Sequence, residues 1–307
     1  MVVKLLTHEH GKGRVRLLKV TRQPDKHTII QLEAEILLEG PAERAYYNGD
    51  NGGVLPTDSV KNTVYVLAKK HEFETIEDFA IILAKHFVSK HPQIIDVAKV
   101  KLFETHWERV VNADSTGKVR PHAHAFVGVD SGISTTYAVA RKAPHGGEPM
   151  ISLSSGIDGW RVMKTTQSSF MDFFRDEYTT LPDTPDRLVG TVVKATWNFT
   201  SEAFRSCFKA QREQVKRVLL DTFAGPADVG VPSDAVQATL YQMGEAVLNE
   251  CPFVKDITIL MPNVHNLPVD LTRFGLKNIH PHGEVFLPTS EPHGIIQAKM
   301  VRSTSRL

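Results

Sequence analysis

The sequence predicts an α+β protein made of two similar domains, each an antiparallel sheet with two helices on one face. Alternating, strand-like stretches separated by turn residues occur in both halves of the chain. A helix that is capped, ended by a proline and followed by a strand appears twice, first after Thr75 and again after Ser233. This repeated order indicates a tandem pair of domains.

In the first half, residues 13–22 and 27–39 are rich in Val, Ile and Leu, with the turn sequence Gln23-Pro24-Asp25-Lys26 between them. Residues 40–53 are glycine-rich and are expected to form a loop. Apolar residues at helical spacing predict helices over 57–70 and from Thr75 to the His91-Pro92 break. Alternation then predicts two further strands, over residues 96–109 and 122–127.

The second half has the same order of elements. Helices are expected over residues 204–223 and, capped by Ser233, up to residue 249. Strands are expected over residues 135–142, 149–154, 186–199, 256–261 and 291–302. The boundary is expected between Val129 and Gly147, where Pro144-His145-Gly146-Gly147 resembles a linker, which gives domains of residues 1–140 and 141–307.

Composition excludes several classes of protein. The chain has 307 residues, of which 41% are hydrophobic, and 36 Lys and Arg against 35 Asp and Glu leave a net charge of +1, unlike a basic nucleic-acid binder. No apolar run reaches the roughly 20 residues of a membrane span, and the N-terminal stretch is too soon interrupted by charge to be a secretory signal. Cys207 and Cys251 are expected to be reduced, buried thiols.

Residues 54–69 contain the start of a predicted helix that could also be a ligand-binding site. Thr57-Asp58-Ser59 precedes a helical pattern, so the plain interpretation of Thr57 is an N-cap whose hydroxyl accepts from a backbone N–H. A helix N-terminus also offers free N–H donors and a partial positive charge, which suit an electron-rich, anionic ligand. The two interpretations are compatible, and both stay open at this point.

Seven motifs resemble those of the urate oxidase (uricase) family, in the family's order, from about His10 to Leu307. They are HGKGRVR, PTDSVKNTVY, KTTQSSF, FRDEYTTLPDTPDR, VQATLY, MPNVH and the final Ser-Arg-Leu. The resemblance implies two tunnelling-fold (T-fold) domains per chain and a homotetramer that closes a tunnel-forming barrel. Sheets with exposed edges need such closure, so an oligomer is also the physical expectation.

The resemblance implies that the chain oxidises urate with dioxygen to 5-hydroxyisourate and hydrogen peroxide. Arg187 would supply a planar fork of donors to the purine, Phe170 would stack on it, and Gln237 with the N–H of Val236 would meet its opposite edge. Ile296 resembles an apolar wall position. From the residues alone, the alternatives are a surface arginine in a turn, a core phenylalanine under a loop and a surface glutamine.

The resemblance also implies a proton relay of Lys12 and Thr57 with His265 behind them. Asn263, with the Thr57 hydroxyl, would hold dioxygen or water above the purine plane, and Asp58 would contribute its backbone N–H. The family places Thr57 and Asp58 in the subunit next to the one that supplies the purine-binding arginine, so sites would lie at subunit interfaces. Without the resemblance, these residues are a solvated lysine, a helix cap and an ordinary histidine.

A metal enzyme is the main alternative, because His122-x-His124 places two imidazoles on one face of a strand. No carboxylate or cysteine cluster completes that site, and deprotonated urate can give electrons to dioxygen itself, so no cofactor and no metal are expected. Another T-fold enzyme acting on a purine or pteridine, with or without a metal, stays open, as does a non-catalytic scaffold. The C-terminal Ser305-Arg306-Leu307 matches a peroxisomal address that an import receptor reads.

Overall fold

The computed structural model describes residues 3–130, 132–278 and 283–302, and its chain divides into two compact units. Unit 1 comprises Met1–Gly156 and unit 2 comprises Ile157–Leu307. Each unit combines antiparallel strands with helices, which confirms the mixed α+β class. The assignment of each unit to the T-fold stays a prediction.

The sheet of unit 1 has the strand order β1-β2-β3-β6, followed by the first part of β7. Its strands are β1 (His10–Arg22), β2 (His27–Glu39), β3 (Val97–Thr105), β6 (Ile133–Arg141) and β7 (Met150–Lys164). All pairings from β1 to β6 are antiparallel. The expected loop over residues 40–53 contains a short helix, α1 (Glu43–Asn48), and a 3-10 turn, Asn51–Gly53.

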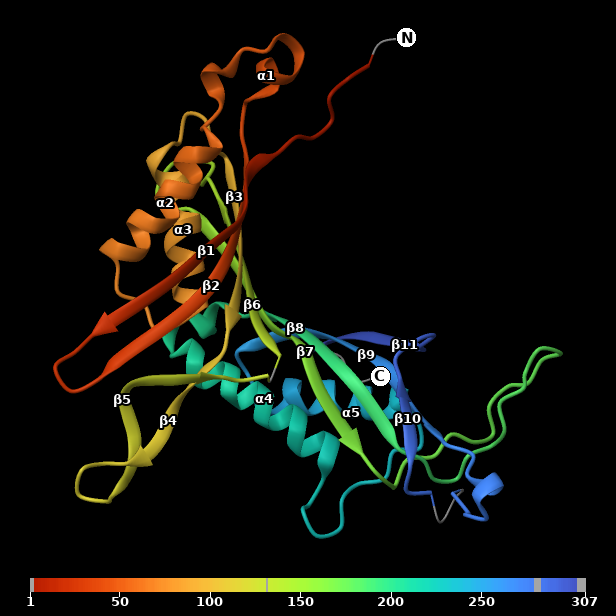
Figure 1. Cartoon of the computed structure of the whole chain (residues 1–307). Helices are drawn as coiled ribbons and strands as arrows, with labels where there is room; N and C mark the ends of the chain where they lie inside the picture. The colour runs from red at the N-terminus through yellow and green to blue at the C-terminus, as the bar shows by residue number, and fades with distance from the viewer. Residues whose placement is uncertain (1–2, 131, 279–282, 303–307) are drawn as a thin grey trace. The chain divides into compact units, whose positions relative to one another are not determined.

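Two helices, α2 (Thr57–Lys70) and α3 (Ile76–Lys90), lie on one face of this sheet (Figure 1). α3 packs on β3 and β6, and α2 packs on β1. The start of α3 is a full capping box, in which the Thr75 hydroxyl accepts from Asp78 N while the Asp78 carboxylate accepts from Thr75 N, as S/T-x-x-acid patterns predict. The core between helices and sheet is fully buried; its largest members include Phe79, Phe87, Ile36 and Leu38.

The single strand expected over residues 96–109 is wrong. β3 ends at Thr105, and a separate hairpin follows, formed by β4 (Trp107–Ala113) and β5 (Val119–Gly128). The alternation of the sequence runs through the break, but the pairing partner changes, since β3 pairs with β2 while β4 pairs with β5. Between them, the His106 ring is within 2.9 Å of the Ser134 hydroxyl.

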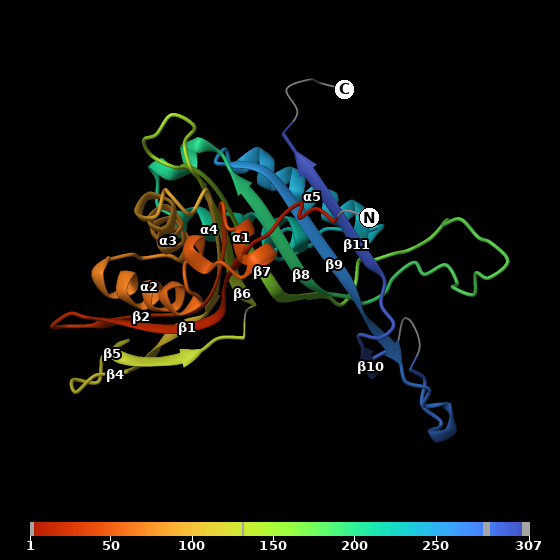
Figure 2. The ribbon, with the colours of Figure 1, turned by 90° about the horizontal axis from the view of Figure 1, so that it is seen from above.

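In unit 2, β9 is the central strand, because it pairs with β8, β10 and β11. The strands are β8 (Val189–Phe199), β9 (Val254–Pro268), β10 (Phe286–Thr289) and β11 (Ile295–Val301), and the second part of β7 precedes β8. α5 (Val236–Glu250) packs on β9 and β11, with α4 (Phe208–Ala224) beside it (Figure 2). The alternate residues of β8 predicted to share one face are all buried, namely Val189, Thr191, Val193, Ala195 and Trp197.

Three details of unit 2 correct the sequence prediction. α5 begins at Val236 with Ala235 as N-cap, so Ser233 does not cap it; the Ser233 hydroxyl lies 2.5 Å from the Thr239 hydroxyl instead. β9 continues seven residues past Met261 because β8 and β10 pair with its later part. β10 was not predicted, since a four-residue strand leaves no periodic pattern.

The division of the chain into two compact units falls inside β7, after Gly156, whereas the sequence placed the domain boundary between residues 129 and 147. Contacts within unit 1 explain the difference, because they hold the first part of β7 and the loop before it. The Ser155 hydroxyl donates to the buried Glu77 carboxylate at 2.7 Å, and the Thr136 hydroxyl donates to Ser154 O at 2.9 Å. That loop is therefore a hairpin connection within unit 1.

Both cysteines are free, as predicted, but only Cys251 is buried. Cys207 is exposed because it is the N-cap residue that precedes α4 and does not lie on the buried face of that helix. Among the described residues, no helix combines the length and the apolar character that crossing a membrane requires. The C-terminal tripeptide lies outside the described residues.

Candidate active site

The residues singled out from the sequence fall into two groups, one in each unit. Unit 1 carries Lys12, Thr57 and Asp58. Unit 2 carries Phe170, Arg187, Val236, Gln237, Asn263, His265 and Ile296. The groups are described separately below.

Lys12 lies at a bulge near the start of β1. Its register partner is Ile36, and the register with β2 shifts between Lys12 and Val15, where Arg14 has a φ of 56°. Gly11 is required here, because a Cβ at that position would collide with the backbone oxygen of Ile36. Bulges re-aim side chains beside functional sites, and this one leaves Lys12 partly buried.

Thr57 does not cap α2. It is the first residue of the helix, and the N-cap is Pro56, which makes no side-chain capping hydrogen bond. The capping interpretation is wrong because Thr57 already has helical geometry, one position past the cap. Its hydroxyl is exposed, and the first-turn N–H groups lack intrahelical partners. The approach to the helix is tied to β1, since His10 Nε2 lies 3.2 Å from Leu55 O.

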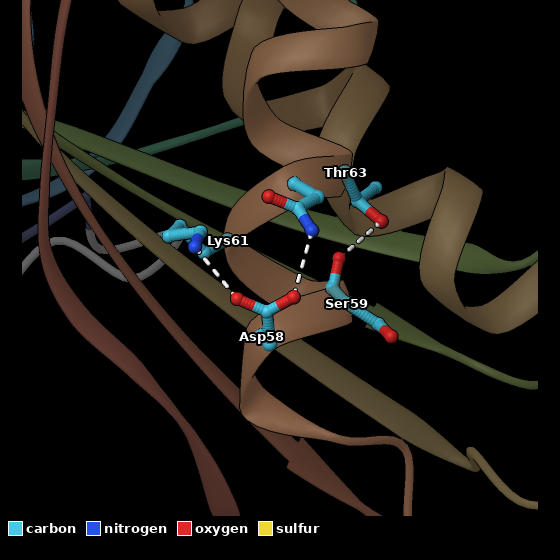
Figure 3. A network of polar contacts seen from close by, with 5 residues as sticks. Asp58, Ser59, Lys61 and Thr63 are labelled. Carbon is cyan, nitrogen blue, oxygen red and sulfur yellow. Dashed lines mark hydrogen bonds and ion pairs between the residues drawn. The ribbon is translucent and has the colours of Figure 1, made fainter.

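The Asp58 carboxylate is engaged along the helix (Figure 3). It accepts from Lys61 Nζ at 2.6 Å and from Asn62 Nδ2 at 2.9 Å. The Lys61 hydrogen bond and charge hold the pKa of Asp58 below its usual value, and the positive charge of Lys12 adds a smaller lowering. Lys12 and Asp58 are therefore close enough to interact electrostatically. The carboxylate therefore has partners of its own, and the ligand contact of the Asp58 backbone N–H stays a prediction.

In unit 2, the segment that carries Phe170 is hydrogen-bonded to the segment that carries Arg187. Phe170 N donates to Thr184 O at 2.8 Å, Thr184 N donates back to Phe170 O at 3.0 Å, and Arg187 N donates to Ser168 O at 2.8 Å. The guanidinium carbon of Arg187 lies 5.2 Å from the centroid of the Phe170 ring. Two side chains from a long loop are thus held close together, with the guanidinium over the ring.

Arg187 is not the surface arginine of a turn. It is half-buried, and burial lowers the pKa of its guanidinium, since the charged form loses hydration. Its Nε is buried without a hydrogen-bond partner among the residues that the structure describes. Phe170 is only partly buried, so it is not a core residue under the loop either.

Asn263 and His265 lie on the face of β9 that faces the helices. Ile257, Ile259 and Met261 bury this face, and the period of two carries it on to Asn263 and His265 near the end of the strand. Thr191 of β8 is the direct partner of Asn263 in the register. The sequence prediction ended the strand at residue 261 and so did not detect this shared face.

Gly294 makes room for the Asn263 side chain, and sequence reasoning did not identify it. Asn263 N donates to Gly294 O at 3.0 Å. A Cβ on Gly294 would lie 3.1 Å from Asn263 Nδ2 and 3.8 Å from Ile296 Cδ1. Both side chains therefore lie next to Gly294, and the role of Ile296 as an apolar wall stays a prediction.

Several buried polar atoms of unit 2 have no hydrogen-bond partner among the described residues. Two of them, Thr191 Oγ1 and Asn263 Oδ1, belong to residues that are register partners on β8 and β9. Two more, Ser168 Oγ and Arg187 Nε, belong to the paired loop segments. Unpaired buried polar groups are costly, so their concentration is expected where a ligand or ordered water supplies the missing partners.

The N-terminus of α5 lies beside the same loop. Ser169 N donates to Ser233 O at 2.9 Å, and Ser233 N donates to Gln167 O at 2.8 Å, so the approach to α5 pairs with the segment before Phe170. Val236 is buried and Gln237 is exposed, both in the first turn, where no side chain caps the helix. The backbone N–H groups of this turn and the Gln237 amide can thus meet a ligand.

The two histidines proposed as possible metal ligands lie close together on β5. The rings of His122 and His124 are 4.6 Å apart, and His122 Nδ1 accepts from His124 N at 3.2 Å and from Ala125 N at 2.9 Å. One of the two imidazoles has therefore committed a ring nitrogen to the backbone. The described part of the chain contains no group of three or more His, Cys, Asp and Glu residues arranged for a metal ion.

Comparisons with known proteins match this chain to uricases. The family model described as Uricase matches residues 8–138 and 153–297. The chain is 41% identical to Uricase-2 isozyme 2 of Glycine max, over 97% of this chain and 95% of that protein. It is also 41% identical to the uricase of Arabidopsis thaliana, over 98% of this chain and 97% of that one. The crystal structure of uricase from Arthrobacter globiformis matches with a TM-score of 0.85 and 36% identity, covering 100% of this chain and 98% of that one.

The chain has an antiparallel α+β fold that holds an arginine beside an aromatic ring, and its named relatives are oxidoreductases. The matches run over nearly the whole length of both partners. The chain belongs to the uricase family.

Proposed function

We propose that this protein oxidises urate with dioxygen, as an oxidoreductase of purine catabolism that needs no cofactor. In the balanced reaction, urate, dioxygen and water give 5-hydroxyisourate and hydrogen peroxide, so the purine loses two electrons and dioxygen gains them. Membership of the uricase family supports the activity. The observation that carries the site is the half-buried Arg187 guanidinium held beside the Phe170 ring.

In this proposal, unit 2 binds the purine. Phe170 stacks on the flat ring, and Arg187 directs its planar fork at adjacent oxygen and nitrogen acceptors. Gln237 and the N–H of Val236 meet the other edge at the start of α5, where the helix dipole favours an anionic substrate. Burial of Arg187 strengthens its attraction for the urate anion, because less water screens the charge.

Proton transfer is assigned to Lys12, Thr57 and His265. The exposed, non-capping hydroxyl of Thr57 is free to accept and donate, and the nearby Lys12 lies at a bulge. Asn263 holds dioxygen or water above the purine plane, with its buried Oδ1 still needing a donor. Its neighbour on β9, His265, relays the proton onward.

The two groups of residues are proposed to meet between protomers. Unit 1 of one protomer supplies Lys12, Thr57 and Asp58, and unit 2 of a neighbour supplies the purine-binding residues. The two T-fold units would close with their copies into a tunnel-forming homotetramer, which removes open sheet edges. Sedimentation of the purified protein, with activity followed on dilution, tests whether turnover is lost as the assembly dissociates.

The decisive experiment is loss of urate absorbance in chelator-treated, metal-analysed protein under air, with hydrogen peroxide assayed in parallel. Equimolar urate loss and peroxide formation are expected. A requirement for added metal, or turnover of a pterin in place of urate, would contradict the proposal and favour a different T-fold enzyme.

Peroxisomal location is proposed from the terminal tripeptide alone. A fluorescent fusion ending in Ser305-Arg306-Leu307 is expected to enter peroxisomes. The same fusion without Leu307 is expected to stay outside, and identical distributions would exclude this address.

A further inference from the structure

We propose that Asp186 is a positioning residue of this site. Its carboxylate fixes the segment of residues 166–170 against the segment that ends in Arg187, and so sets the spacing between the Phe170 ring and the Arg187 guanidinium. The inference rests on the proposed function, because that spacing matters only if both groups hold a flat substrate.

Both carboxylate oxygens of Asp186 accept from the segment that leads to Phe170. The Thr166 hydroxyl donates to Oδ2 at 2.7 Å, and Ser168 N donates to Oδ1 at 3.3 Å. Hydrogen bonds to a carboxylate are stronger than those between neutral groups. The Asp186 side chain therefore binds both Thr166 and Ser168 of the opposite segment.

A backbone hydrogen bond also holds Ser168, one of the two residues that Asp186 binds. Ser168 O accepts from Arg187 N at 2.8 Å, so Ser168 is held by both Asp186 and Arg187. Ser168 is 1% exposed, which shields these bonds from water. Two residues further on, Phe170 exchanges two backbone bonds with Thr184. These hydrogen bonds fix the position of Phe170 relative to the backbone of Arg187.

The contacts of Asp186 with Thr166 and Ser168 also leave the Arg187 guanidinium available to the substrate. Asp186 and Arg187 are adjacent, yet among the described residues the carboxylate makes no ion pair with that guanidinium. Its oxygens are taken by Thr166 and Ser168, while the guanidinium lies over Phe170 at 5.2 Å. A carboxylate free to turn toward Arg187 would compete with the substrate for the same donors.

Asp183 in the same loop provides a matched control. It accepts from Asp172 N at 3.1 Å and forms an ion pair with Arg175 at 3.0 Å. It therefore braces the outer part of the loop with a comparable pair of contacts. Neither of its partners is Phe170 or Arg187.

The test compares Asp186→Ala, Asp186→Asn, Thr166→Val and Asp183→Ala with the wild type. KM and kcat for urate are measured, and urate binding is measured by equilibrium dialysis without dioxygen. Asp186→Ala is expected to weaken urate binding and raise KM roughly tenfold. The reason is that displaced Arg187 and Phe170 side chains can no longer both contact the substrate in the right geometry. Asp186→Asn keeps one acceptor oxygen and is expected to recover most of the binding.

Thr166→Val removes one of the two contacts without altering Asp186, so a smaller rise in KM is expected. This variant also decides the matter if Asp186→Ala does not fold. Asp183→Ala is expected to keep KM within about twofold of the wild type.

Wild-type binding in Asp186→Ala and Thr166→Val overturns the inference, as does an equal loss in Asp183→Ala, which would indicate general loosening of the loop. In both cases the wild type still oxidises urate, so the proposed function stands. A wild type inert toward urate overturns the proposed function and this inference together.

Discussion

The Arg187 guanidinium lies 5.2 Å from the centroid of the Phe170 ring, although a long loop separates the two residues in the chain. Backbone pairing between residues 168–170 and 184–187 creates this contact. A planar cation and an aromatic ring are both groups that bind flat anions, the first through its donors and the second by stacking. The contact therefore predicts that substitutions at Arg187 change the binding of urate.

Replacing Arg187 is expected to weaken urate binding, and more so the more of its planar set of hydrogen-bond donors is lost. Arg187→Ala removes charge-assisted hydrogen bonds of about 1.5–3 kcal/mol, so kcat/KM should fall roughly tenfold to a hundredfold. Arg187→Lys keeps the charge without the planar fork and should restore only part of the loss. Steady-state kinetics with urate measure both. Arg109→Ala is the control, since Arg109 also lies over a phenylalanine, Phe126, at 5.0 Å; an equal effect there would refute a special role for Arg187.

Thr57→Ala is expected to lower turnover sharply while leaving thermal stability unchanged. Thr57 makes no cap bond at the start of α2, so removing its hydroxyl costs the helix little. Loss of a proton-transfer group costs about 10²–10⁴-fold in rate. Turnover under saturating urate and a thermal melt test the two halves. A large fall in melting temperature with normal turnover would reverse the assignment.

Thr75→Ala should behave in the opposite way. Thr75 forms the capping box of α3 with Asp78, and loss of such a cap costs about 1 kcal/mol. For a chain of this size, the melting temperature should fall by about 2–4 °C. Turnover per folded molecule should be unchanged. An unaltered melt would show that the cap contributes nothing to the unfolding step.

Lys12→Met is expected to reduce turnover sharply with urate binding nearly intact, because the variant loses the base but leaves unit 2 untouched. Lys19→Met is the control on the same strand, since Lys19 pairs with Glu72 at 3.6 Å. Stopped-flow turnover and anaerobic binding are the measurements. Normal rates in both Lys12→Met and Thr57→Ala would exclude the relay.

Gly294→Ala should lower turnover by displacing the Asn263 amide. The new Cβ would lie 3.1 Å from Asn263 Nδ2, tighter than an ordinary contact, so the amide must shift. Gly128→Ala is the control, because its Cβ would meet only the Trp107 ring at 3.8 Å. A Gly294→Ala enzyme as active as Gly128→Ala would separate Asn263 from the reaction.

The two cysteines should differ in reactivity toward a thiol reagent. Burial raises the pKa of Cys251 to about 11, so little of the reactive thiolate exists near neutral pH, and the side chain is also shielded. Cys207 is exposed and should be modified first. Mass spectrometry of native protein is expected to show one label, and of denatured protein two. Labelling of Cys251 in the native state would contradict its burial.

Elements with strong local patterns were predictable from the sequence. α2 spans residues 57–70 as predicted, and the Thr75 cap, the β2 strand and the buried face of β8 agree with the structure. Local patterns failed where pairing partners decide the outcome, as at His106, where one alternating run becomes two strands. They failed again at Ser233 and Thr57, because capping depends on where the helical turn begins, and either residue could have occupied the cap.

The residues of the candidate site were predicted by resemblance, and the chemistry that each side chain could perform could be stated from the sequence. The sequence by itself determined the kinds of groups available and the elements that carry them, since both follow from side-chain type and period. Only the tertiary structure decided which groups share a surface. Register places Thr191 opposite Asn263, and loop pairing places Phe170 beside Arg187, because contacts between distant segments depend on how strands pair across the whole unit.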